Sequence, residues 1–128
     1  MKICFTLLLL LISTFAQAQT GVPRIGVLVQ ELGRSQSQAI KGLNLELKQL
    51  GYSERKNFHF ETRNARGDRS ALQAAAKELA TKGVEVIFTI GTRAALAAAA
   101  ATQAIPLVFV LPGDPVASGL LKNSADAA

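Results

Sequence analysis

The chain has 128 residues, of which 49% are hydrophobic, and a formal net charge of +5 at pH 7, which suits one small domain with its own apolar core. Its 14 basic residues are scattered among 9 acidic ones and form no stripe with interleaved aromatic residues, a pattern typical of a solvated surface. The composition therefore argues against a nucleic-acid partner, which usually requires positive charge concentrated on one face.

The first 18 residues are predicted to be a secretory signal peptide. Lys2 supplies a positive charge, residues 3–15 are almost wholly apolar, and residues 16–18 (Ala-Gln-Ala) have the small-x-small spacing of a cleavage site. The alternative is a membrane anchor, but the apolar run is shorter than the about 20 residues that a spanning helix needs. Cleavage after Ala18 would release residues 19–128 as one exported mature domain.

The only cysteine is Cys4, which lies before the apolar run. Cleavage of the signal peptide would remove it. The mature chain would then have no thiol, no disulfide and no thiolate metal site. We expect it to fold by its apolar core, with no metal and no cofactor.

The first half of the mature chain alternates strand and helix patterns. Residues 24–30 (RIGVLVQ) are a short run of branched apolar residues, typical of a buried strand. In residues 35–50 apolar side chains recur every three or four positions, which predicts an amphipathic helix, and Gly51 can end it. Residues 57–63 (NFHFETR) alternate apolar and polar side chains, which predicts a strand near the edge of a sheet.

The second half continues this alternation. Ser70 and Gln73 have the spacing of a capping box at the start of a helix, and Gly83 is placed to end that helix. The remaining predicted elements are a strand, an alanine-rich helix, a strand, and a turn or short helix, at residues 84–90, 93–102, 106–111 and 113–121.

Four strands that alternate with three helices predict an α/β fold. The strands should be parallel, with right-handed crossovers and helices on both faces. We expect a doubly wound, three-layer arrangement with the strand order 2-1-3-4. In such a sheet, ligands bind beyond the carboxyl ends of the strands. That rule selects the four loops at residues 30–35, 64–68, 91–93 and 112–115.

Two of these loops combine a small polar side chain with a tight turn. Thr92 follows Gly91 and precedes the alanine-rich helix, so its Oγ can cap that helix, or the N–H groups of the first turn can bind an anion. Asp114 lies between Gly113 and Pro115 and can either cap the next turn or receive a ligand amine or hydroxyl. The sequence leaves both alternatives open at each position.

The catalytic motifs expected in this fold class are missing from the sequence. There is no G-x-G-x-x-G and no Walker-type loop. The third strand ends at Gly91 and not at the aspartate that a response-regulator receiver needs. The only histidine, His59, falls within the second predicted strand, far from the other polar strand ends, so it suits no acyl-transfer triad. We therefore expect no catalytic residue and no enzymatic activity.

Five segments are each weak as single motifs, but their shared order and spacing are fairly specific. They are GLNLELKQLGY, RNARGD, IGTRAA, IPLVF and DPVASG, at residues 42–52, 63–68, 90–95, 105–109 and 114–119. Together they resemble the amino-terminal half of the substrate-binding proteins of ABC transporters, in particular the group that includes tryptophan/tyrosine-type binding proteins. The resemblance spans nearly the whole mature chain.

The resemblance implies a periplasmic-binding-protein-like lobe, one of two that close on a small polar solute such as an amino acid. It implies that strand-end loops line the cleft, with Thr92 and Asp114 as the main ligand contacts and Gln30 and Asn64 beside them. The expected function is the solute-binding component of an ABC importer, which delivers solute to a permease in the inner membrane. The alternative is an exported sensory or interaction module with the same fold and no uptake role.

Only the amino-terminal lobe is expected within residues 19–128, because the chain stops shortly after the last matching segment. The second lobe of such proteins would be absent. A half cleft cannot enclose a solute, so we expect weak or no solute binding by this lobe alone. We also expect that the exposed cleft surface favours self-association.

Overall fold

The most apolar segments of the chain form the centre of a parallel sheet. The computed structural model describes residues 21–110 and 113–121, so the predicted signal peptide lies outside the described residues. In spatial order the strands are β2 (His59–Asn64), β1 (Arg24–Val29), β3 (Val86–Ile90) and β4 (Leu107–Val110). All paired strands are parallel, which confirms the predicted order and places the half-polar strand β2 at an edge.

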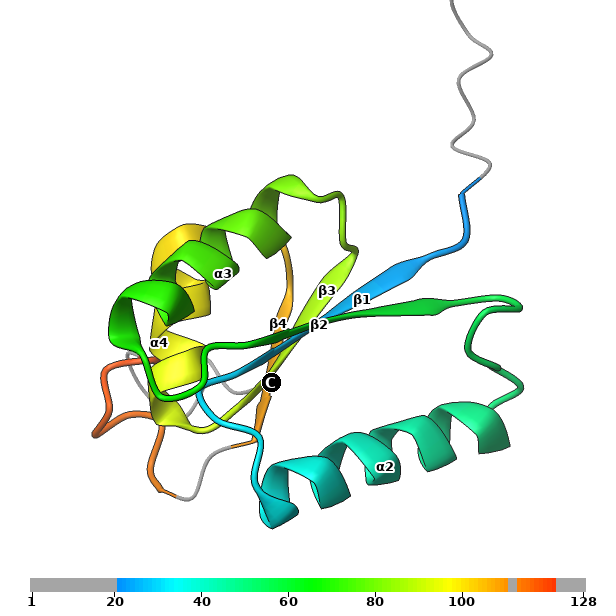
Figure 1. The fold of residues 1–128 in the computed structure, drawn as a ribbon, viewed down its shortest axis with the longest axis horizontal. Coiled ribbons are helices and arrows are strands. Elements are labelled where there is room, and N and C mark those ends of the chain that lie inside the picture. Colours follow the sequence, from blue (N-terminus) through cyan, green and yellow to red (C-terminus); the bar gives the residue numbers. More distant parts are fainter. Residues whose placement is uncertain (1–20, 111–112, 122–128) are drawn as a thin grey trace, which may run out of the picture.

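Three helices cover this sheet from two sides. They are α2 (Arg34–Gln49), α3 (Arg69–Thr81) and α4 (Thr92–Ala101). Figure 1 shows α2 on one face and the pair α3 and α4 on the other. The predicted three-layer α/β class is therefore confirmed, and the predicted turn after β4 is present at residues 115–119.

Side chains of the central strands alternate between two separate cores, as the period of a strand requires. Leu28 and Ile87 lie in the core beneath α3 and α4. The other core contains Val27, Val29, Phe88 and Ile90, with Ala39, Ile40 and Leu43 of α2 packed against it. Burial on both faces explains why β1 and β3 appear in the sequence as continuous apolar runs.

The two faces of the sheet are covered unequally. In α4, three alanines are buried, because a helix face without large side chains can lie close to the sheet. By contrast, α2 has no fully buried residue. On the same side of the sheet as α2, Val108 and Val110 of β4 are 50% and 44% exposed. We call the outward surface formed by these two valines the uncovered β4 face.

The start of α3 differs from the prediction. The N–H of Ala71 donates to Asp68 Oδ1 at 3.0 Å, so Asp68 is the N-cap and the predicted capping box of Ser70 and Gln73 is wrong. Asp68 has the extended backbone that an N-cap needs. Ser70 is already helical, so its hydroxyl cannot take that position.

An ion-pair network joins the edge strand β2 to α3. Arg63 Nη2 donates to Glu78 Oε1 at 2.8 Å, and Arg63 and Lys82 each lie 3.6 Å from Glu61 Oε2. The hydrogen bond from Arg63 holds the pKa of Glu78 below its ordinary value. The pair is exposed to solvent, so its contribution to stability is modest.

This network predicts a small pH dependence of stability. Because the pKa of Glu78 is lowered in the folded state, its ionised form stabilises the fold above the ordinary glutamate pKa of about 4.3, and this contribution is lost as the pH falls toward the lowered value. The free energy of unfolding, measured with urea, should therefore fall more on acidification for the native chain than for Glu78→Gln. Glu46→Gln, at an exposed position on α2, is the control and should keep the native pH dependence. Equal pH dependence in all three proteins would contradict the prediction.

Candidate functional site

The carboxyl ends of the parallel strands meet at one rim of the sheet. In the strand register, Val29 of β1 lies opposite both Asn64 of β2 and Ile90 of β3. The residues that follow, Gln30 and Gly91, therefore leave the sheet at the same level. The rim thus brings together segments that are far apart in the sequence, as the predicted topology requires.

Two of the four predicted site residues line one cavity at this rim. The cavity has a volume of about 280 Å³, and we call it the rim cavity. Its lining residues are Gln30, Glu31, Gln36, Ile90, Gly91, Thr92, Arg93 and Ala94. Gln30 and Thr92 are the predicted members. The walls come from the ends of β1 and β3 and the first turns of α2 and α4.

The role predicted for Thr92 in the helix cap is wrong. Gly91 is the N-cap of α4, with φ +94° and ψ 152°, and its carbonyl accepts from the N–H of Ala95 at 3.1 Å. No side-chain hydrogen bond caps this helix. A positive φ is readily adopted only by glycine, so the turn occurs at Gly91 and Thr92 is already the first helical residue. The side chain of Thr92 contributes to the wall of the rim cavity instead.

Asn64 and Asp114 each use a side-chain oxygen in a local turn. The N–H of Arg66 donates to Asn64 Oδ1 at 2.9 Å, and the N–H of Val116 donates to Asp114 Oδ1 at 2.8 Å. Both contacts are Asx turns, which fix the backbone of the loop. The turn-capping alternative for Asp114 is thus confirmed. Neither residue lines the rim cavity, so a ligand contact by either one stays a prediction.

Sequence reasoning missed Gln36 as a member of the rim, and it selected the loop that contains Arg93 without naming Arg93 as a ligand contact. Gln36 Oε1 accepts from the N–H of Gly33 at 3.2 Å and from Ser35 Oγ at 3.0 Å, so its side chain folds back over the start of α2. Arg93 lies in the first turn of α4, where a positive charge is unfavourable to the helix. This unfavourable placement was the one signal in the sequence that could have drawn attention to Arg93.

Other features lie away from the rim. His59 begins β2 at the opposite, amino end of the sheet, as its sequence position predicts, and lines a cavity there with Arg24 and Arg55.

Across residues 21–110 and 113–121, no three His, Cys, Asp or Glu side chains gather as metal ligands would. Within the same residues, no helix has both the length and the apolar character needed to cross a membrane.

The family of the chain follows from its match to known sequences. The profile of the family described as ABC transporter substrate binding protein matches residues 24–128. The chain belongs to this family. The resemblance noted in the sequence is therefore confirmed, and it covers every described helix and strand.

Individual relatives agree with this assignment. A tyrosine-binding protein of Clostridioides difficile (strain R20291) is 33% identical over 89 residues, which are 70% of this chain and 26% of that protein. Three solved structures each match 80% of this chain and 35% of their own. They are a conserved domain protein from Vibrio cholerae (29% identity, TM-score 0.77), a ligand-free, open substrate binding protein with adhesive properties from Clostridium difficile (30%, 0.76) and an ABC domain in complex with L-Trp from Streptococcus pneumonia (28%, 0.75). The chain spans between 26% and 35% of the length of these substrate-binding relatives.

The turn that shapes the rim cavity is open to a direct test. Gly91→Ala should destabilise the fold by about 1–3 kcal/mol, because alanine is strained at this φ, while the added Cβ would meet no atom within 4 Å. Gly42→Ala is the matched control in the middle of α2, where the new Cβ also meets nothing. It should stabilise the helix by about 1 kcal/mol. Urea unfolding measures both changes, and native stability in Gly91→Ala would contradict the described turn.

Proposed function

We propose that the chain is the amino-terminal lobe of the solute-binding component of an ABC importer, and that its rim cavity binds part of a small polar solute such as an amino acid. The rim cavity carries this proposal, because it lies beyond the carboxyl ends of parallel strands in a chain of a substrate-binding family. Two similar proteins support an amino-acid solute: one is named a tyrosine-binding protein, and one was solved with L-Trp.

The chemistry of the rim cavity suits a zwitterion. Glu31 and Arg93 place a carboxylate and a guanidinium in the same cavity, matching an α-ammonium and an α-carboxylate. The amides of Gln30 and Gln36 and the hydroxyl of Thr92 can donate and accept hydrogen bonds around these charges. In this proposal, Asn64 and Asp114 contact the parts of a larger solute that extend along the rim.

The proposed role places the protein outside the cytoplasmic membrane. Residues 1–18 would direct its export to the periplasm and would then be removed. An ABC permease in the inner membrane would receive the solute, and a second lobe would close the cleft. An exported sensory or interaction module is the second candidate, which the adhesive properties of one structural neighbour support.

Nuclear magnetic resonance titration of the purified chain with L-tyrosine and L-tryptophan tests the site. Changes in amide chemical shift should centre on Gln30, Gly91 and Thr92. The dissociation constants should lie above the micromolar range, because one lobe cannot enclose the solute. Thr92→Val should weaken binding roughly two- to tenfold by removing one hydrogen bond. Thr62→Val, on the exposed edge of β2, should not.

Two outcomes would count against the proposal. Amide shifts confined to another part of the chain would remove the rim cavity as the site, as would equal binding by the native chain and Thr92→Val. Micromolar binding by the chain alone would contradict the expected weakness of a half cleft.

Self-association is a further expectation for the isolated lobe. Besides the expected cleft surface, we propose the uncovered β4 face, which exposes Val108 and Val110 on β4, the last strand in the described sheet; such surfaces favour association. The mean mass from sedimentation should rise with protein concentration. Val108→Ser should reduce this rise, whereas Leu50→Ser, at an exposed leucine beyond α2, should not. A constant monomer mass at high concentration would contradict the expectation.

A further inference from the structure

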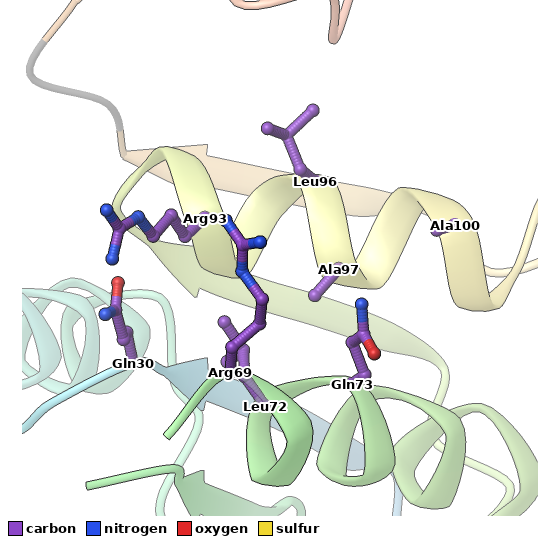
Figure 2. A pocket seen from close by; sticks show the side chains of 8 residues that line it. All are labelled: Gln30, Arg69, Leu72, Gln73, Arg93, Leu96, Ala97 and Ala100. Atoms are coloured by element: carbon purple, nitrogen blue, oxygen red, sulfur yellow. The ribbon is translucent and has the colours of Figure 1, made fainter. Parts of the chain in front are cut away.

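A second cavity lies between α3 and α4, next to the rim cavity. It has a volume of about 200 Å³, and we call it the interhelix cavity. The polar side chains on its walls are Arg69, Arg93, Gln30 and Gln73, and Leu72 and Ala97 are among its apolar ones. In Figure 2, Arg69 and Gln73 rise from α3 toward α4, and Arg93 extends from α4 over Gln30. The two cavities share only Gln30 and Arg93.

Within the described residues, neither arginine of this cavity forms an ion pair, although Glu31 lies with Arg93 on the wall of the rim cavity. Within residues 21–110 and 113–121, every ion pair involves Arg63 or Lys82, and neither Arg69 nor Arg93 takes part. Asp68, the nearest acidic residue in sequence, caps α3 with its carboxylate. The chain therefore neutralises Arg63 with two glutamates and leaves two guanidinium groups on one small cavity.

The two arginines are exposed, and the helices that carry them gain no stability from their charges. Arg69 and Arg93 each lie in the first turn of a helix, and neither helix has an acidic residue there. A cation in that turn opposes the helix dipole, and two cations around one cavity also repel each other. Both penalties fall when an anion occupies the space between the two guanidinium groups, so the arrangement favours a ligand of negative charge.

The walls also limit the size and kind of that anion. Guanidinium groups bind carboxylate or phosphate oxygens through paired N–H donors, and the amides of Gln30 and Gln73 add further donors. Leu72 and Ala97 offer apolar contact for a carbon skeleton. The volume is below the roughly 300–1,000 Å³ of pockets for drug-sized ligands. We propose that the interhelix cavity binds a small organic dianion, either a dicarboxylate or a phosphate monoester with a short apolar body.

This site shares Gln30 and Arg93 with the proposed amino-acid site, but its other walls differ. Arg69 and Gln73 line the interhelix cavity and are absent from the walls of the rim cavity. Substitution of Arg69 therefore separates the two sites. Arg93 does not, because it lines both.

Calorimetric titration of the purified chain with succinate and with n-propyl phosphate tests the inference, with ionic strength held constant. Saturable binding of at least one dianion is expected, and the preferred one identifies the acidic group. Succinamide has the same skeleton as succinate without charge and should not bind. Arg69→Gln should weaken dianion binding roughly tenfold or more, since hydrogen bonds to charged groups are the stronger ones. It should leave the shifts caused by L-tyrosine at the rim unchanged.

The control variant is Arg55→Gln, which replaces an exposed arginine at the other end of the sheet and changes the net charge equally. It should bind the dianion as the native chain does. The inference would be overturned if no dianion bound saturably, if succinamide bound as well as succinate, or if Arg55→Gln lost as much affinity as Arg69→Gln. Each of these results would leave the amino-acid site of the rim untouched, so the two proposals fail separately.

Discussion

Parallel pairing of β1 with both of its neighbours is the constraint on which the candidate site depends. Because β1 lies between β2 and β3 and runs in the same direction, three strands end at one rim and their amino ends lie at the other. A parallel pair also needs a long crossover, and each crossover here contains a helix. The helices α3 and α4 therefore begin beside the rim, and their first turns supply Arg69, Thr92 and Arg93 to the two cavities.

Packing on the two faces of the sheet divides the molecule into a closely packed side and a more exposed side. Small side chains let α4 approach the sheet, and α3 packs beside it over the core around Leu28 and Ile87. On the other side α2 leaves the valines of β4 exposed. The interhelix cavity thus lies between the two closely packed helices, whereas the uncovered β4 face is free for another surface.

Much of the fold could be predicted because its elements have strong local patterns. The alternation of apolar runs with helical stripes predicted every strand and helix to within two residues at each end, and the alternation itself predicted the parallel order. The details of helix starts were less predictable. Asp68 and Ser70 are both good N-cap residues, and only the backbone conformation at Asp68 decides between them. At α4 the positive φ of Gly91 moves the start of the helix by one residue and takes Thr92 out of the cap.

The candidate site was predictable only in outline. The strand-end rule selected the loops of Gln30 and Thr92, and these two residues do share a cavity. The same rule also selected Asn64 and Asp114, whose side-chain oxygens are held in turns of their own loops. It gave no sign of Gln36, since a glutamine in the first turn of a helix is an ordinary surface residue.

The sequence by itself determined the fold class, the strand order and, through five ordered motifs, the family. These properties follow from hydrophobic periods and turn residues, which are local and tolerate errors of a residue or two. Tertiary structure alone decided which side chains share a cavity and which arginines of the described residues form ion pairs. That outcome depends on strand register and on the rotation of each helix, where a shift of one residue moves a side chain to another face.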